Sequence, residues 1–251
     1  MNEYLKNVKK VEFVVTDACT GRCKHCSEGD HSQSGKSIDP KIAGDVVKKL
    51  ASVYGLKTVM AFGGEPLLYP ECVYEIMREA MAAKVPKRQV ITNGYFTNDE
   101  QRMVEVANKL ALCGVNELLL SADAFHQEFI PLENVIRFAK ITVEAGLKTK
   151  VQPAWLVSRD DSNKYNAETK KIVAELCSLG IAENEGNVIF PEGNAKIYLA
   201  EYFVDANPQN PYVEDPYNIK CVSVGCNGTV LGDNIYKNDI LEIIKSYVSL
   251  C

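Results

Sequence analysis

The chain repeats one pattern six times: a short apolar run typical of a β-strand, then an amphipathic run typical of a helix. The predicted strands begin near residues 11, 58, 89, 117, 148 and 187. These spacings suit βαβ units of about 30 residues or more, whose crossovers are right-handed and whose strands are parallel. The pattern predicts an α/β fold, either a partial (β/α)6 barrel of the TIM type or an open doubly wound sheet.

Two helix starts carry capping signals. Asp39 precedes Pro40, so a cap residue is followed by a proline that suits the first helical position. Thr97 stands three residues before Glu100, which fits a capping box. Apolar residues at helical spacing follow both signals, and we expect helices to begin at these points.

The composition is that of a globular protein. The 251 residues are 46% hydrophobic and 24% charged, with a net charge of −5. Basic and acidic residues are mixed, so no basic stripe for nucleic acid is evident. No apolar run reaches the roughly 18–20 residues that span a bilayer, and the first residues lack the apolar core of a signal peptide. We expect a soluble cytoplasmic protein without a membrane or nucleic-acid partner.

The chain after residue 195 departs from the repeating pattern. Loop signals rich in proline and asparagine come first, and a hairpin is then predicted over residues 221–231 around an Asn-Gly turn. A short amphipathic helix is predicted to follow it. We therefore expect two parts: a core over residues 1–195 and a small C-terminal extension of hairpin and helix over residues 196–251.

Most of the unusual residues fall at the strand-to-helix junctions. In parallel α/β folds these junctions lie together at the carboxyl ends of the strands, where ligands bind. The opposite junctions are short and carry little polar content. The candidate site residues at the carboxyl ends are Cys19, Cys23, Cys26, Gly63, Gly64, Glu65, Pro66, Asn93, Ser121, Asp123, His126 and Gln152.

Three cysteines share the first junction. Cys19, Cys23 and Cys26 have the spacing C-x3-C-x2-C, and thiolates so close in sequence can converge on one soft metal centre. Three ligands leave one position of a four-cysteine cluster open to a non-protein ligand. The alternative is a zinc knuckle that adds His25, although adjacent His25 and Cys26 are poorly placed to bind one tetrahedral ion.

At this point the sequence resembles the radical S-adenosylmethionine (radical SAM) enzymes. The hallmark of that superfamily is C-x3-C-x-aromatic-C after the first barrel strand, and His25 holds the aromatic position. The run Gly63-Gly64-Glu65-Pro66 after the second strand matches the other common motif. The resemblance covers roughly residues 11–195. It implies a partial (β/α)6 barrel of the TIM type, and a motif in its expected structural context is stronger than a pattern alone.

The resemblance also implies roles for individual residues. Cys19, Cys23 and Cys26 would hold a [4Fe–4S] cluster, and S-adenosylmethionine would chelate its fourth iron. The loop of Gly63 and Gly64 would accept hydrogen bonds from the methionyl amino group. The remaining cofactor-binding candidates are His25 at the adenine edge, Ser121 and Asp123 at the ribose or carboxylate, Val188 and Ile189 at the adenine wall, and Glu65, Pro66, Asn93 and Gln152.

Some of these residues also have a purely structural interpretation. Gly63-Gly64-Glu65-Pro66 fits a tight turn in which the proline opens a helix. Asp123 fits an Asx-turn or a helix cap. His126 is either an ordinary loop residue or one that faces the substrate, which makes it the one candidate for a catalytic side chain. Trp155, the only tryptophan, is expected to pack in the core.

The remaining six cysteines fall into two groups. Three lie within or beside apolar helical faces and are expected to be buried, inert thiols: Cys72, Cys113 and Cys177. Three lie in the C-terminal extension, which resembles the start of the SPASM or twitch extensions of peptide-modifying radical SAM enzymes: Cys221, Cys226 and Cys251. These are too few for a full auxiliary cluster set, and a metal-free extension is the favoured interpretation.

The resemblance implies radical chemistry. The reduced cluster would split S-adenosylmethionine to give a 5′-deoxyadenosyl radical, which would take a hydrogen atom from the substrate. An electron donor such as flavodoxin or ferredoxin would be a partner. A ribosomally made peptide is the favoured substrate, and a glycyl-radical-enzyme activase or a maturase of a small molecule or cofactor is the alternative. From another class, a non-catalytic iron–sulfur or zinc protein remains open.

Overall fold

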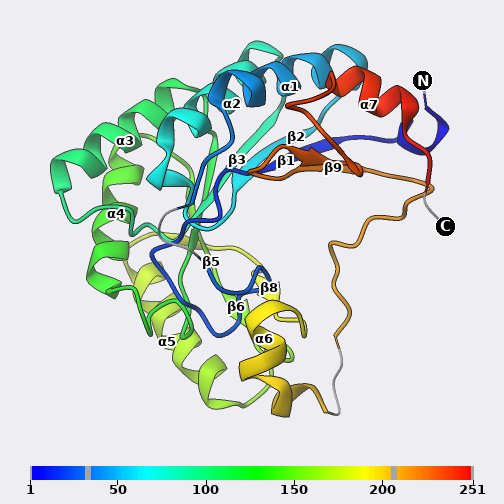
Figure 1. Ribbon diagram of the computed structural model, residues 1–251. Helices are drawn as coiled ribbons and strands as arrows, with labels where there is room; N and C mark the ends of the chain where they lie inside the picture. Colours follow the sequence, from blue (N-terminus) through cyan, green and yellow to red (C-terminus); the bar gives the residue numbers. More distant parts are fainter. Residues whose placement is uncertain (1, 32–34, 205–207, 250–251) are drawn as a thin grey trace.

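A computed structural model describes residues 2–31, 35–204 and 208–249. Its centre is a curved sheet of seven parallel strands in the order β7-β5-β4-β3-β2-β1-β9 (Figure 1). The strands are β1 (Lys10–Val14), β2 (Thr58–Phe62), β3 (Lys87–Thr92), β4 (Glu117–Ser121), β5 (Thr149–Gln152), β7 (Ala182–Glu183) and β9 (Cys221–Val224). Two further two-stranded sheets pair β6 (Ala154–Trp155) with β8 (Asn187–Val188) and β10 (Thr229–Val230) with β11 (Asp233–Asn234).

Helices connect successive strands along the outer side of the curved sheet (Figure 1). They are α1 (Pro40–Val53), α2 (Pro70–Ala82), α3 (Glu100–Leu112), α4 (Leu132–Glu144) and α5 (Lys164–Ser178), whereas α6 (Gly193–Tyr198) follows β8 and α7 (Ile240–Ser246) follows β11. Three single 3-10 turns, Glu3–Leu5, Pro66–Leu68 and Ala200–Phe203, complete the regular structure. Within the described residues, no helix combines the length and the apolar character that a membrane crossing requires.

The main core lies between the sheet and these helices. Val11 and Phe13 of β1 are fully buried in it, whereas Glu12 between them is half-buried on the opposite face. This alternation follows from the two-residue period of a strand. The inner face of the sheet is therefore left to line the concave side of the fold. The predicted partial barrel is confirmed.

The sixth predicted strand differs from expectation. Residues 187–190 do not follow β5 in the main sheet; the edge position belongs to β7, and β8 pairs with β6 instead. The cause lies at Pro153, which separates β5 from β6. Proline has no backbone N–H and cannot continue a hydrogen-bonded ladder, so the chain leaves the main sheet here. The Pro153 carbonyl then accepts from Asn187 N at 2.9 Å.

The C-terminal segment joins the main sheet. β9 pairs in parallel with β1, and Val222 and Val224 are fully buried in the main core. The predicted hairpin over 221–231 is therefore wrong in its pairing, although a turn does form where Gly228 N donates to Gly225 O at 2.8 Å. Its first arm pairs with β1, and its second arm pairs onward with β11. The proposed boundary between residues 195 and 196 stays a prediction.

One helix start is as predicted and the other is shifted. Asp39 caps α1 by accepting hydrogen bonds from two backbone N–H groups of the first turn. In α3 the cap is Asp99, which accepts from two N–H groups in the same way. Thr97 accepts from Asp99 N at 3.1 Å and lies outside the helix. Asp99 is therefore the N-cap residue of α3, and the capping-box prediction that gave this role to Thr97 is wrong.

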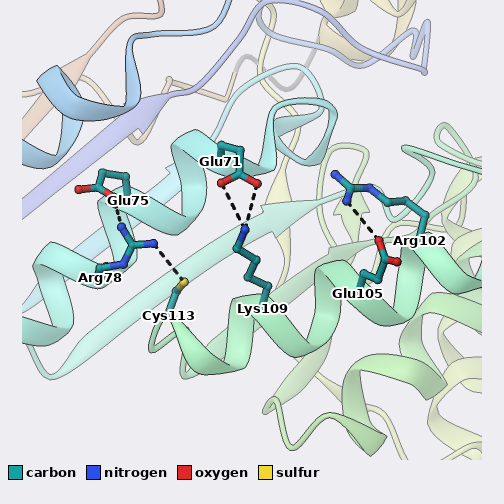
Figure 2. Close-up of polar contacts among 7 residues, drawn as sticks. All are labelled: Glu71, Glu75, Arg78, Arg102, Glu105, Lys109 and Cys113. Carbon is teal, nitrogen blue, oxygen red and sulfur yellow. Dashed lines mark hydrogen bonds and ion pairs between the residues drawn. The ribbon is translucent and has the colours of Figure 1, made fainter.

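Polar contacts between side chains connect α2 to α3 and the residue after it on the outer surface (Figure 2). Lys109 Nζ of α3 lies 3.1 Å from Glu71 Oε1 of α2, and Arg78 of α2 approaches Cys113 Sγ at 4.0 Å. Ion pairs as exposed as these contribute at most about 1 kcal/mol each. The helices are held mainly by the apolar faces beneath them.

The cysteines outside the first junction differ in burial. All eight described cysteines are free, and Cys72 and Cys113 are buried as expected. Cys177 is exposed, because its position near the end of α5 faces away from the core. The prediction that this thiol is buried is therefore wrong. Cys251 lies outside the described residues. Trp155 is 2% exposed and packs in the core as expected.

Candidate active site

The three cysteines of the first junction line one cavity at the carboxyl ends of the strands. Cys19 and Cys23 are buried and Cys26 is half-buried, in the loop that follows β1. The cavity has a volume of about 110 Å³. The other described residues that line it are Gly21, His25, His31, Phe62, Gly63, Gly64, Ile91, Thr92, Asn93, Ser121 and His126.

The surroundings of the sulfur atoms suit an iron–sulfur cluster. A Cβ atom at Gly21 would lie 3.2 Å from Cys23 Sγ and 3.8 Å from Cys19 Sγ, so both sulfurs border the same small space. Gly21 N donates to Cys19 Sγ at 3.3 Å, and Asn93 Nδ2 lies 3.7 Å from that sulfur. Hydrogen bonds to cysteine sulfur help to set the reduction potential of such clusters.

Without a metal these thiols hold their protons. Burial raises the pKa of Cys19 to about 11 and also raises the pKa of Cys23 and of Cys26. A soft metal centre binds thiolates, so loading must displace these protons. The donor set of three soft sulfurs around one cavity fits a [4Fe–4S] cluster with one open position.

The loop after β2 packs its backbone directly against the cysteine loop. Gly64 N donates to Thr16 O at 2.7 Å, and Glu65 N donates to Ala18 O at 2.7 Å. A Cβ atom at Gly64 would lie 2.1 Å from Ala18 O, closer than any real contact. The Gly-Gly pair is thus required by the close approach of two backbones, and both glycines also line the cavity.

Glu65 connects the β2 loop to the end of β3. Its carboxylate is fully buried and accepts hydrogen bonds from Thr92 Oγ1 at 2.7 Å, Leu67 N at 2.9 Å and Asn93 N at 2.8 Å. Burial raises the pKa of Glu65 to about 7, although these donors favour the charged form. Glu65 therefore positions Asn93, which lines the cavity, and does not line the cavity itself.

The carboxylate of Asp123 is likewise occupied by hydrogen bonds from other residues of the chain. Its Oδ1 accepts from Phe125 N and His126 N at 3.0 Å each, and its Oδ2 accepts from Ala154 N at 3.1 Å and His126 Nδ1 at 2.8 Å. This is the turn geometry that the sequence also allowed. Burial alone would raise the pKa of Asp123, but His126 and the hydrogen bonds lower it below its ordinary value.

Two further histidines border the cavity. His25 lies against Phe125 with ring centroids 5.0 Å apart and ring planes tilted by 39°, and burial lowers the pKa of His25 to about 4. His31 Nε2 lies 3.1 Å from Cys26 Sγ, and His31 Nδ1 lies 2.7 Å from Asp17 O. His31 is not among the site residues predicted from the sequence. Its position only five residues after Cys26 was the available signal.

Besides Glu65 and Asp123, four more of the predicted cofactor-binding residues lie outside the cavity lining. Gln152 Nε2 donates to Asn187 Oδ1 at 3.2 Å, and Pro66 is buried at the start of a 3-10 turn. Val188 is 39% exposed, whereas Ile189 is buried in a small apolar cluster. A cofactor role for these four residues stays a prediction.

A second donor set overlaps the cysteine loop. One ligand atom each from Cys23, His25 and His126 lies within 4.8 Å of the others. Such a set can bind a zinc ion, and it shares only Cys23 with the cluster ligands. Metal content can therefore distinguish zinc binding from a cluster.

The sequence of the core matches one family model. The model of the radical SAM superfamily matches residues 13–152, which contain the cysteine loop and the Gly-Gly loop. The chain belongs to the radical SAM superfamily. Radical SAM proteins are enzymes that bind a [4Fe–4S] cluster and S-adenosylmethionine. The resemblance noted in the sequence is thus confirmed.

Curated relatives in this superfamily carry the name GTP 3′,8-cyclase. The chain is 25% identical over 154 residues to a probable GTP 3′,8-cyclase of Methanocaldococcus jannaschii, covering 58% of this chain and 49% of the relative. It is 26% identical over 168 residues to the GTP 3′,8-cyclase of Clostridium perfringens, covering 65% and 50%. The radical SAM chain thus spans about half the length of the curated relatives it matches.

Solved structures share the fold. Streptococcus suis SuiB bound to S-adenosylmethionine superposes with a TM-score of 0.60 at 14% identity, covering 95% of this chain and 65% of SuiB. The anSMEcpe protein with bound AdoMet gives a TM-score of 0.54 at 13% identity, covering 95% and 80%. These likenesses place the chain in the partial TIM-barrel architecture of its superfamily.

Proposed function

We propose that this chain binds a [4Fe–4S] cluster through Cys19, Cys23 and Cys26 and uses S-adenosylmethionine to remove a hydrogen atom from a peptide substrate. The observation that carries the proposal is the cavity that all three cysteines line beside the Gly-Gly loop. When bound, the reduced cluster supplies the electron that splits S-adenosylmethionine into methionine and a 5′-deoxyadenosyl radical.

The chain's own residues bind and enclose the reactants. The backbone of Gly63 and Gly64 borders the cavity and is open to a ligand, because neither residue has a side chain. Phe62 and Ile91 provide apolar walls that exclude water, and Ser121 offers a hydroxyl at the end of β4. A dry, fixed site protects a reactive radical and holds the target C–H bond in place.

The barrel has an open side, which favours an extended peptide as the substrate. β7 and β9 are the two ends of the main sheet and do not pair with each other. The segment from residue 208 to β9 runs along this open side (Figure 1). Backbone pairing thus does not close the sheet into a full barrel, which favours an extended substrate over a fully enclosed one. The chain after β9 forms the β10–β11 pair and α7, and the resemblance of this extension to those of peptide-modifying radical SAM enzymes favours a peptide substrate.

A small-molecule substrate is the second candidate. The curated relatives that match the core are GTP 3′,8-cyclases, enzymes named for a nucleotide. The two candidates differ in what stimulates turnover. A precursor peptide encoded beside this chain should stimulate 5′-deoxyadenosine release if the first is right, and GTP should do so if the second is right.

Anaerobic reconstitution tests the core of the proposal. The loaded protein should hold about four irons per chain and release 5′-deoxyadenosine with dithionite and S-adenosylmethionine. The Cys23→Ala variant should lose both the iron and the product. Cys177→Ala removes an exposed thiol outside the site and is the matched control, which should retain both. A wild-type protein that loads only zinc, or a Cys23→Ala variant that keeps its iron, contradicts the proposal.

A further inference from the structure

Three lysines stand immediately before three neighbouring strands, at the end of the sheet opposite the cavity. Lys220 precedes β9, Lys9 precedes β1 and Lys57 precedes β2. Lys9 N donates to Lys220 O at 2.9 Å, and Lys57 N donates to Lys9 O at 2.7 Å. The ladders that follow align the first residues of the three strands, so the three lysines stand level with one another. We call these three residues the basic rim.

The basic rim has no counter-charge within the part of the chain that the structure describes. Lys9, Lys57 and Lys220 are exposed, and none of their ammonium groups forms an ion pair with another described residue. Glu214 accepts a hydrogen bond from Lys220 N at 2.6 Å, which is a contact to the backbone. Neighbouring strands lie about 4.8 Å apart, and like charges directly opposite each other on such strands are destabilising. The rim thus gathers three unpaired positive charges in a chain whose net charge is −5.

The carboxylates on the nearby strands are already paired with other lysines. Glu12 of β1 pairs with Lys10 at 2.5 Å. Glu117, at the start of β4, is buried and pairs with Lys150 at 2.9 Å. Neither carboxylate pairs with a lysine of the basic rim, so the charge of the rim is open to a partner from outside the chain.

The dipoles of the helices do not account for the basic rim. A lysine in the last turn of an α-helix, or just after it, complements the negative end of the helix dipole. Lys57 stands four positions after the end of α1 at Val53, whereas Lys9 and Lys220 do not follow an α-helix. The three lysines come from distant parts of the sequence, and only the parallel pairing of their strands brings them into one row.

We propose that the basic rim is a docking surface for an acidic segment of the peptide substrate. This inference rests on the proposed function. An extended peptide places alternate side chains on one face about 6.8 Å apart, and flexible lysine side chains on neighbouring strands can reach carboxylates at that spacing. The negative charge of the whole chain repels a long polyanion such as nucleic acid, whereas a short acidic segment needs to contact the rim alone.

The position of the rim sets the spacing within such a substrate. β9 is an end strand of the main sheet, so the rim begins at the open side of the barrel. The cavity lies beyond the other end of β1, which has five residues and is therefore about 17 Å long. A peptide docked on the rim needs at least about six extended residues between its acidic segment and the residue that reacts.

Binding of a labelled peptide of ten glutamates to the full chain tests the inference. Fluorescence anisotropy should detect binding at about 50 mM sodium chloride and a large loss of affinity at about 500 mM. The triple variant Lys9→Gln, Lys57→Gln and Lys220→Gln should bind the peptide at least about tenfold more weakly than wild type. The urea midpoint of the metal-free triple variant should equal or exceed that of wild type at low salt, because neighbouring like charges are removed.

A second triple variant is the matched control. Lys48→Gln, Lys140→Gln and Lys170→Gln change exposed lysines of α1, α4 and α5 that form no ion pair with another described residue, and they lower the net charge equally. This control should bind the glutamate peptide within about twofold of wild type, because general attraction between distant charges is screened.

Each outcome decides the inference. Absence of binding by wild type, equal affinity of the two triple variants, or a lowered urea midpoint of the rim variant overturns the docking surface. An oligothymidylate of equal charge that binds the rim more tightly than the glutamate peptide overturns the choice of partner. A wild-type chain that loads no cluster refutes the proposed function, whatever the peptide measurements give.

Discussion

Gly64 has no Cβ atom, and this allows the cysteine loop and the Gly-Gly loop to form backbone hydrogen bonds with each other. In Gly64→Ala, the added Cβ would lie 2.1 Å from Ala18 O, and neither backbone can give way without losing the Glu65 N to Ala18 O bond. We expect a loss of more than about 2 kcal/mol in unfolding free energy and a lower iron content. Urea unfolding of the metal-free chain and iron analysis after reconstitution measure the two effects.

Gly55→Ala provides the control for this prediction. No atom lies within 4 Å of a Cβ placed there, and its backbone is not left-handed. Alanine should be neutral or stabilise the protein by up to about 1 kcal/mol. If Gly64→Ala behaved like Gly55→Ala, the close approach of the two loops would be wrong.

Glu65 makes stability depend on pH. Its pKa of about 7 in the folded protein exceeds the ordinary 4.5, so the folded state holds an extra proton between these values. The contribution of Glu65 therefore falls as pH rises from 4.5 through 7, by about 3 kcal/mol at most. Urea unfolding of the metal-free chain at pH 5, 6, 7 and 8 should reveal this decline, and Glu65→Gln should flatten it. An unchanged slope in Glu65→Gln would assign the dependence to other groups.

The role of a single residue could be predicted from the sequence where local backbone geometry alone determines it. The need for two glycines beside the cysteine loop followed from the motif, and the hydrogen bonds of Asp123 within its own turn followed from its Asx-turn pattern. The hydrogen bonds that Asp123 and Glu65 accept from distant parts of the chain did not. Asp123 accepts from Ala154 N, 31 positions away, and Glu65 accepts from Asn93 N, 28 positions away. Such pairs form only when separate loops meet in the fold, and local sequence carries no record of them.

At the scale of elements, the start of α3 gives a sharp test of capping. Asp99 accepts from two N–H groups of the first turn, so Asp99→Ala should cost about 1 kcal/mol of stability. Thr97→Ala removes one exposed bond outside the helix and should cost less. Thermal or urea unfolding of the two variants compares them. A larger loss for Thr97→Ala would restore the capping-box interpretation.

Elements with strong periodicity were predicted well, and short ones were not. The helices α1 to α4 and the strands β1 to β4 follow from runs of apolar residues at clear spacing. β7 has only two residues, of which Ala182 is exposed, and a pair of residues has no period to detect. Its place in the sheet is set by the ladder with β5, which the sequence does not encode locally.

At the scale of the whole molecule, the sheet is extended by residues from near the end of the chain. β9 pairs with β1 although Cys221 and Lys10 are 211 positions apart. The sequence predicted a strand here but assigned it to a local hairpin, because an Asn-Gly turn favours the nearest partner. Hydrophobic pairing with β1 prevails, since it buries Val222 and Val224 in the main core.

This arrangement predicts that the extension and the barrel unfold together. Val222→Ala removes fully buried methyl groups at the far end of the sheet from Trp155 and should cost about 2 kcal/mol. If the molecule is one cooperative unit, Trp155 fluorescence and circular dichroism should report the same midpoint and shift equally in the variant. Val213→Ala, at a position 74% exposed, should leave both midpoints unchanged. Two separate transitions, with only the circular dichroism signal shifted, would instead support an independent C-terminal unit beginning near residue 196.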